Sequence, residues 1–86
     1  SSPNHEIVTI SDRIFVYLPL IGNRFIRTSC DKYINLVENK FKNQDYYLLL
    51  NTNYCDLDSL IKTEQYFLKI DKIFEHKNHQ LYFITN

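Results

Sequence analysis

The sequence is poor in the residues on which several kinds of site depend. Its 86 residues include one glycine, two cysteines and no methionine. A single glycine cannot build a glycine-rich phosphate loop, which excludes the nucleotide sites that need one. Cys30 and Cys55 are too few for a disulfide framework. We therefore expect two unpaired thiols in a reducing compartment, with one bridge as the alternative.

The sequence also has no excess of positive charge and no long apolar run. Ten basic and ten acidic side chains give a formal net charge of zero, which makes nucleic acid an unlikely partner. The apolar runs are far shorter than the roughly 20 residues that span a bilayer. No signal peptide is visible in these residues, and they contain no Asn-x-Ser/Thr acceptor. We therefore expect an intracellular, cytoplasmic protein without a membrane span.

What the chain does contain is enough apolar and aromatic surface for one core. The hydrophobic fraction is 44% and the aromatic fraction is 15%, which argues against a disordered chain. The length allows one domain. We expect residues 6–86 to form it and residues 1–5 to be a disordered lead-in or a cloning remnant, so the chain would be an excised domain.

The first third of the chain has the pattern of extended segments. Residues 6–10 are β-branched, and residues 13–18 carry the strongest strand signal because they are β-branched and aromatic. Gly22 and Asn23 form the best hairpin turn in the sequence. Residues 24–28 would then be the return strand of this hairpin.

A helix is predicted next. It would begin at Thr28 or Ser29, and its apolar stripe, with Tyr33 at the border, has the spacing of one helix face: Cys30, Ile34, Val37 and Phe41. Residues 46–50 form a short continuous apolar run, typical of a central strand that is covered on both faces.

The last third of the chain is less regular. Residues 56–62 could be a short helix capped by Asp56 or an ordered loop. Residues 65–70 are predicted to be extended, residues 75–79 to form a polar turn, and residues 81–85 to be the closing strand. A helix laid across one face of a mixed sheet satisfies these patterns, so the expected fold class is α+β.

This order of elements resembles the ubiquitin-like β-grasp fold, and short stretches resemble a Ras-association domain. The resemblance covers roughly residues 13–86, and it depends on five stretches: RIFVYLP at 13–19, RFIRTS at 24–29, ENKF at 38–41, DYYLL at 45–49 and QLYFI at 80–84. The resemblance implies that the second strand pairs with a strand of a Ras-like small GTPase. The positions that match the basic residues of that interface are Arg24, Arg27 and Lys32.

Aromatic residues add to this predicted surface. If Ile14 and Ile26 face the helix, alternation places Phe15, Tyr17 and Phe25 on the opposite face beside Arg27. Such a ridge has the composition of a protein–protein contact. The alternatives are that the chain's own segments cover the ridge, and that the arginines only protect a solvated edge strand.

The other chemistry-bearing residues do not combine into a predicted site. His76 and His79 lie in a predicted turn without a third ligand, so we expect no metal site. Asp56 and Asp58 lack the glycine and the terminal glutamate of a calcium loop. We expect neither an enzyme nor a cofactor, and instead a non-catalytic module that binds another protein.

Two alternatives to GTPase binding remain. The domain could self-associate, or dock within a larger parent protein, through Phe15, Tyr17 and Phe25. It could also resemble a STAS-like regulatory domain, which would need a real helix from residue 56 to about residue 68 and mostly parallel central strands.

Overall fold

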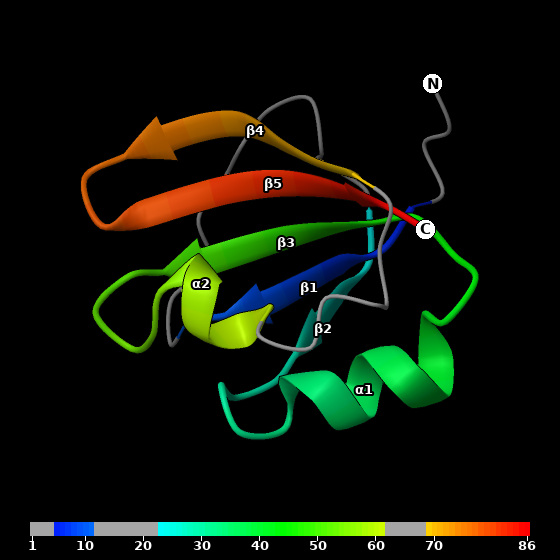
Figure 1. Cartoon of the computed structure of the whole chain (residues 1–86). Helices are drawn as coiled ribbons and strands as arrows, with labels where there is room; N and C mark the ends of the chain where they lie inside the picture. The colour runs from blue at the N-terminus through cyan, green and yellow to red at the C-terminus, as the bar shows by residue number, and fades with distance from the viewer. Residues whose placement is uncertain (1–4, 12–22, 62–68) are drawn as a thin grey trace.

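A five-stranded mixed sheet with both described helices on one side forms the body of the domain (Figure 1). The computed structural model describes residues 5–11, 23–61 and 69–86. In these ranges the elements follow one another as β1 (Ile7–Ile10), β2 (Phe25–Arg27), α1 (Tyr33–Lys40), β3 (Tyr46–Asn51), α2 (Leu57–Leu60), β4 (Lys69–His76) and β5 (His79–Thr85).

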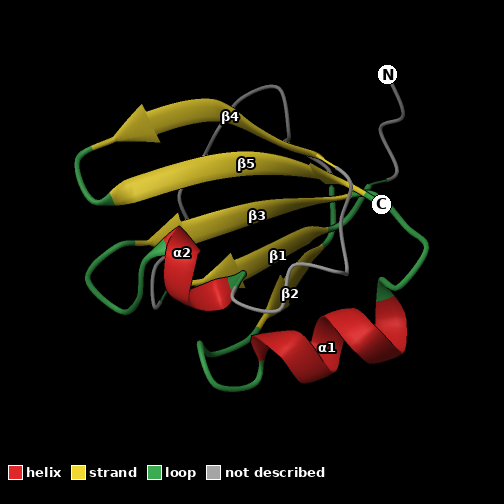
Figure 2. Cartoon of the chain, in the orientation of Figure 1, coloured by secondary structure: helices red, strands yellow, loops and turns green. Residues whose placement is uncertain are grey.

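The sheet combines a parallel half with an antiparallel half. Its strand order is β2-β1-β3-β5-β4. β1 pairs in parallel with β2 and with β3, whereas β5 runs antiparallel to both β3 and β4 (Figure 2). The predicted α+β class with a mixed sheet is confirmed. The predicted strand at residues 13–18 and the turn at Gly22 lie outside the described residues.

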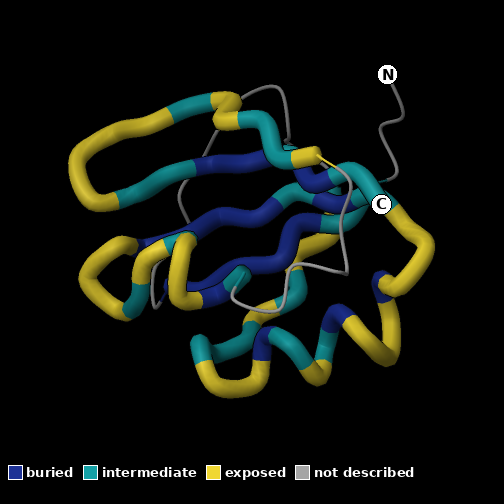
Figure 3. Tube along the Cα trace, in the orientation of Figure 1, coloured by how far each residue is buried: buried dark blue, intermediate teal, exposed yellow. Residues whose placement is uncertain are grey.

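Most of the core lies between the sheet and the two helices. Val8, Leu48 and Ile84 reach 0% exposure and pack with Val37 of α1 and Leu60 of α2. A second cluster of Ile7, Leu49 and Leu81 lies on the other face of the sheet. β3 is therefore buried on both faces, as its apolar run predicts, and it is the middle strand of the sheet (Figure 3).

The first segment of the domain has a larger role than the sequence indicates. Residues 7–10 are extended as expected, but the resemblance leaves them outside the core fold. In the structure all four residues of β1 are buried, and β1 lies between β2 and β3. The side chains of Val8 and Ile10 pack into the core on the helix side of the sheet, and that of Ile7 packs into the cluster on the other face. β1 thus buries apolar side chains on both faces.

The main helix begins later than predicted. α1 starts at Tyr33, and Lys32 occupies its N-cap position without a side-chain cap. Ser29, a predicted cap, instead donates from its hydroxyl to the Asp31 carboxylate at 2.7 Å. Tyr33 was expected at the border of the stripe, but it is buried, and its hydroxyl bonds to that of Tyr46 inside the core.

The expectation of two unpaired thiols is wrong. Cys30 and Cys55 form a disulfide with a Cα–Cα distance of 6.3 Å, which is within the usual range for such a bridge. Cys30 follows β2 and Cys55 follows β3. Both strands are parallel to β1, so their carboxyl ends meet at the same edge of the sheet. Nothing in the spacing of two cysteines reports this proximity.

The last hairpin has a shorter turn than predicted. β4 continues to His76 and β5 begins at His79, so Lys77 and Asn78 alone connect them, and not the whole of residues 75–79. Lys77 has a φ of 54°, in the left-handed region that favours glycine. Because neither Lys77 nor Asn78 is a glycine, the sequence predicts the turn but not its two-residue length.

Of the two alternatives for residues 56–62, the structure adopts the short helix. The side chain of Asp56 accepts a hydrogen bond from the backbone N–H of Ser59 at 2.9 Å and caps α2. α2 ends at Leu60, whose side chain is buried against the core.

Candidate functional site

The strand with the predicted binding residues, β2, lies at one edge of the sheet that the described residues form. β2 pairs with β1, in a register that sets Phe25 beside Ile7 and Arg27 beside Thr9. The N–H of Ile7 donates to the C=O of Arg24 at 2.8 Å, and the N–H of Thr28 donates to the C=O of Thr9 at 2.9 Å. A parallel ladder uses alternate residues of a strand, so the backbone groups of Phe25 point away from β1.

The side chains of β2 follow the predicted alternation. Ile26 is half-buried and packs against the core, whereas Phe25 and Arg27 are exposed. Phe25 is 41% exposed, which is unusual for so large an apolar side chain in a sheet. Phe15 and Tyr17, the other members of the predicted aromatic ridge, lie outside the described residues.

Two more predicted residues complete this surface. Arg24 precedes β2 and is exposed, and so is Lys32 at the start of α1. We call Arg24, Phe25, Arg27 and Lys32 the β2 surface. Phe25 and Arg27 lie on the same face of the strand, and Arg24 and Lys32 add two more exposed cations on either side of them in the chain. This is the composition of a contact with an acidic protein surface.

A pocket opens at the end of this strand. It has a volume of about 430 Å³. We call it the strand-end pocket, because its lining comes from the end of β1, from the turn after β3 and from the end of β2 with the loop that follows it: Ile10, Ser11, Arg27, Thr28, Ser29, Cys30, Asp31 and Tyr54.

The polar side chains of the pocket are held in place. The Ser29 hydroxyl bonds to Asp31 and lowers the pKa of that carboxyl, as do a backbone hydrogen bond and the neighbouring Lys32. The Ser11 hydroxyl lies 3.2 Å from Nε2 of His79. The lining therefore includes one carboxylate, Asp31, and one arginine, Arg27.

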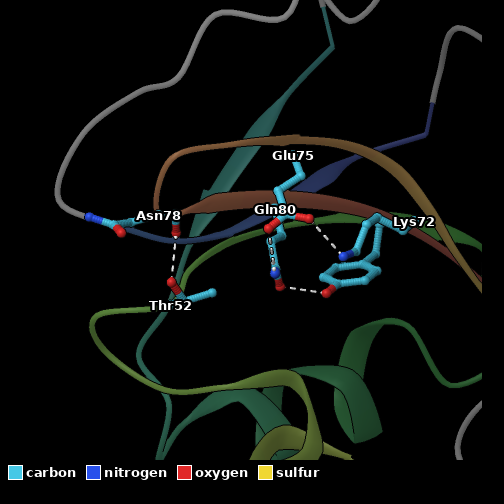
Figure 4. A network of polar contacts seen from close by, with 6 residues as sticks. Thr52, Lys72, Glu75, Asn78 and Gln80 are labelled. Atoms are coloured by element: carbon cyan, nitrogen blue, oxygen red, sulfur yellow. Dashed lines mark hydrogen bonds and ion pairs between the residues drawn. The ribbon is translucent and has the colours of Figure 1, made fainter.

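A second group of polar side chains lies on β4 and β5 (Figure 4). The Lys72 ammonium donates to Glu75 at 2.8 Å, Gln80 donates to the same carboxylate at 3.3 Å, and the Tyr82 hydroxyl donates to Gln80 at 2.5 Å. The hydrogen bond from Lys72 lowers the pKa of Glu75, while burial raises the pKa of Tyr82. Lys72 and Glu75 are both exposed. We therefore interpret these hydrogen bonds as contacts that order the surface of the β4–β5 hairpin.

Two buried tyrosines, Tyr33 and Tyr46, have strongly raised pKa values. The hydroxyls of Tyr33 and Tyr46 bond to each other inside the core. Burial raises the pKa of Tyr46 to about 12, partly opposed by its hydrogen bond with Tyr33. Burial also raises the pKa of Tyr33. Both hydroxyls therefore stay neutral at physiological pH.

The histidines do not form a metal centre with the residues described. His76 and His79 are partners at the end of the β4–β5 ladder. Within residues 5–11, 23–61 and 69–86, no three His, Cys, Asp or Glu side chains come together in a group that could hold a metal ion. None of the helices in these ranges is long and apolar enough to cross a membrane.

No protein-family model matches the chain, and neither the curated proteins nor the solved structures include a match. The fold and the β2 surface define a small α+β domain with an exposed aromatic and cationic edge.

Sequence reasoning did not find the pocket or the disulfide beside it. Ile10, Arg27 and Tyr54 are separated by 17 and 27 positions in the chain, so no local motif joins them. The one available signal is the position of Cys30 and Cys55, each of which follows an extended segment.

Proposed function

We propose that this chain is a non-catalytic protein-interaction module that binds an acidic partner through the β2 surface. The observation that carries the proposal is the 41% exposure of Phe25, with Arg24 and Arg27 beside it in sequence and exposed as well. Aromatic and arginine side chains dominate the energy of protein contacts, and an exposed ring beside two guanidinium groups is suited to such a role.

The specific partner proposed is a small GTPase of the Ras family. The resemblance to ubiquitin-like β-grasp and Ras-association domains supports it, as does the α+β architecture with α1 across one face of the sheet. Arg24, Arg27 and Lys32 would steer the acidic switch region of the GTPase, and the strand would pair with its edge. The GTPase would need the edge of β2 that faces away from β1, and a hairpin of residues 13–18 with β2 would occupy that edge, so the GTPase proposal requires it to stay open.

The proposed GTPase partner and the disulfide are typical of different cellular compartments. An intracellular location is part of the GTPase proposal, whereas disulfides persist mainly in oxidising compartments. Both forms of the chain therefore have to be assayed, the oxidised form with its Cys30–Cys55 bridge and the reduced form.

The test compares GTPase binding by matched charge reversals. Arg27→Glu and Arg24→Glu should each weaken binding to a Ras-family protein loaded with a GTP analogue by about tenfold or more. Lys42→Glu reverses an exposed charge after α1 and should leave binding unchanged. Isothermal titration gives the affinities, and thermal unfolding checks that each variant is folded. Equal affinity for the GDP-loaded and GTP-loaded forms would exclude recognition of the switch region.

Self-association through the same surface is the second candidate, because the exposed Phe25 would serve a copy of the chain equally well. Light scattering over a concentration series separates the two candidates. A dimer that Phe25→Ala dissociates would favour self-association, and a concentration-independent monomer would exclude it.

A STAS-like regulatory domain is the remaining alternative. The parallel pairing of β1 with both β2 and β3 favours it. Its required helix over residues 56–68 does not match α2, which ends at Leu60.

A further inference from the structure

The strand-end pocket lies at a reversal in the topology of the sheet. The chain passes from β1 to β2 on one side of β1 and then to β3 on its other side. All three strands are parallel, so their carboxyl ends lie at the same edge. In open sheets with parallel strands, ligands bind outside the carboxyl ends where the connections reverse direction. The pocket opens at this edge, between Ile10, Arg27 and Tyr54.

Covalent and hydrogen bonds hold the walls of this pocket in position. The Cys30–Cys55 disulfide joins the loop after β2 to the loop after β3. Tyr54 precedes Cys55, and its N–H donates to the C=O of Asn51 at 3.0 Å. A site whose walls are ordered before binding loses less conformational entropy when a ligand enters.

The lining suits an apolar group with an acidic neighbour. The lining is mostly apolar; it includes Tyr54, which is 50% exposed, the half-buried Cys30 and the buried Ile10. The volume of about 430 Å³ is near the lower end of the range for ligand sites, roughly 300–1,000 Å³, and it has room for one or two side chains. The lining includes one cation, Arg27, and one carboxylate, Asp31, and the exposed Lys32 directly follows Asp31 in the chain.

We infer that the strand-end pocket receives one aromatic or large aliphatic side chain from an acidic segment of the partner protein. The apolar side chain lies against Tyr54 and the disulfide, while carboxylates next to it in the segment contact Arg27 and Lys32. The inference rests on the proposed function, because this partner is the protein that contacts the β2 surface.

Peptide titrations followed by NMR test the inference on the oxidised, ¹⁵N-labelled chain. The probe is acetyl-Glu-Glu-Phe-Glu-Glu-amide, with alanine in place of phenylalanine as one comparison and lysine in place of glutamate as another. The phenylalanine peptide should cause saturable shifts of the Ser11, Ser29 and Tyr54 amides. The other two peptides should bind about tenfold more weakly or not at all.

Variants of the exposed Tyr54 separate the pocket from the rest of the surface. Tyr54→Ala should weaken binding of the phenylalanine peptide about fivefold, and Tyr54→Phe should retain it. Equal affinity of the phenylalanine and alanine peptides would overturn the inference, as would an unaltered affinity of Tyr54→Ala.

Absence of any saturable shift would also overturn the inference, even where the GTPase binds the wild type and loses affinity with Arg24→Glu. In the converse case, peptide binding at Ser11, Ser29 and Tyr54 without GTPase binding would support the pocket and refute the GTPase.

Discussion

Removal of the Cys30–Cys55 disulfide is the perturbation with the largest expected effect. The bridge spans 25 positions of the chain. In the chain-entropy account, closing a loop of that length in the unfolded state contributes about 3.5 kcal/mol at 25 °C. A domain of 86 residues has a total stability of about 4–13 kcal/mol. Loss of the bridge should therefore remove a large part of the free energy of unfolding and lower Tm by roughly 15–25 °C.

The assay is urea and thermal unfolding of the wild type, with and without a reductant, and of the Cys30→Ala/Cys55→Ala variant. Alanine is chosen because both cysteines are half-buried and pack against the core, where a hydroxyl would add its own cost. The reduced wild type and the double variant should lose similar stability, and reductant should have no effect on the variant.

Two results would refute this reasoning. Alkylation of the purified, unreduced chain under denaturing conditions could label two thiols, which would exclude the bridge. Alternatively, the reduced and oxidised chains could unfold at the same urea concentration. In that case the loops after β2 and β3 would be held together in the unfolded ensemble without the bond.

Three further predictions concern the core and the last turn. Tyr33→Phe and Tyr46→Phe should each lower the free energy of unfolding by about 1–3 kcal/mol, because each leaves one buried hydroxyl without its partner. The double variant should be closer to neutral. A double-mutant cycle measures this coupling, and additive losses would contradict it. Because burial raises the pKa of Tyr46 to about 12, the unfolded chain ionises first, so stability is full below pH 10 and falls between pH 10 and 12. The loss should be about 3 kcal/mol in urea unfolding, and the double phenylalanine variant should lack this contribution. Lys77→Gly should raise the free energy of unfolding by about 0.5 kcal/mol, since φ is 54° there; an equal gain from Lys77→Ala would assign the effect to charge instead.

The burial of side chains could be predicted from the sequence where it depends on the geometry of a single helix or strand. The apolar stripe of α1 is set by a spacing of three and four residues, and Val37 and Phe41 are buried as that spacing predicts. The run at residues 46–50 predicts a strand covered on both faces, and β3 is such a strand. Alternation likewise places Ile26 inward and Phe25 outward. Side-chain direction in a helix or strand follows from backbone geometry alone.

Features that join distant segments could not be predicted in the same way. The tyrosine pair joins α1 to β3, and it places Tyr33 in the core where the helical pattern places it at a border. The position of β1 between β2 and β3 depends on pairings over 18 to 40 positions of the chain, for which the order of segments is no guide.

The sequence alone thus determined the α+β class, the main helix, the middle strand and the polarity of the β2 side chains, because each follows from the residues within one turn of helix or one strand. Only the tertiary structure decided the order of the strands, the Cys30–Cys55 bridge and the pocket beside it. Those depend on which carboxyl ends meet at one edge of the sheet, and strand pairing between distant segments sets that edge.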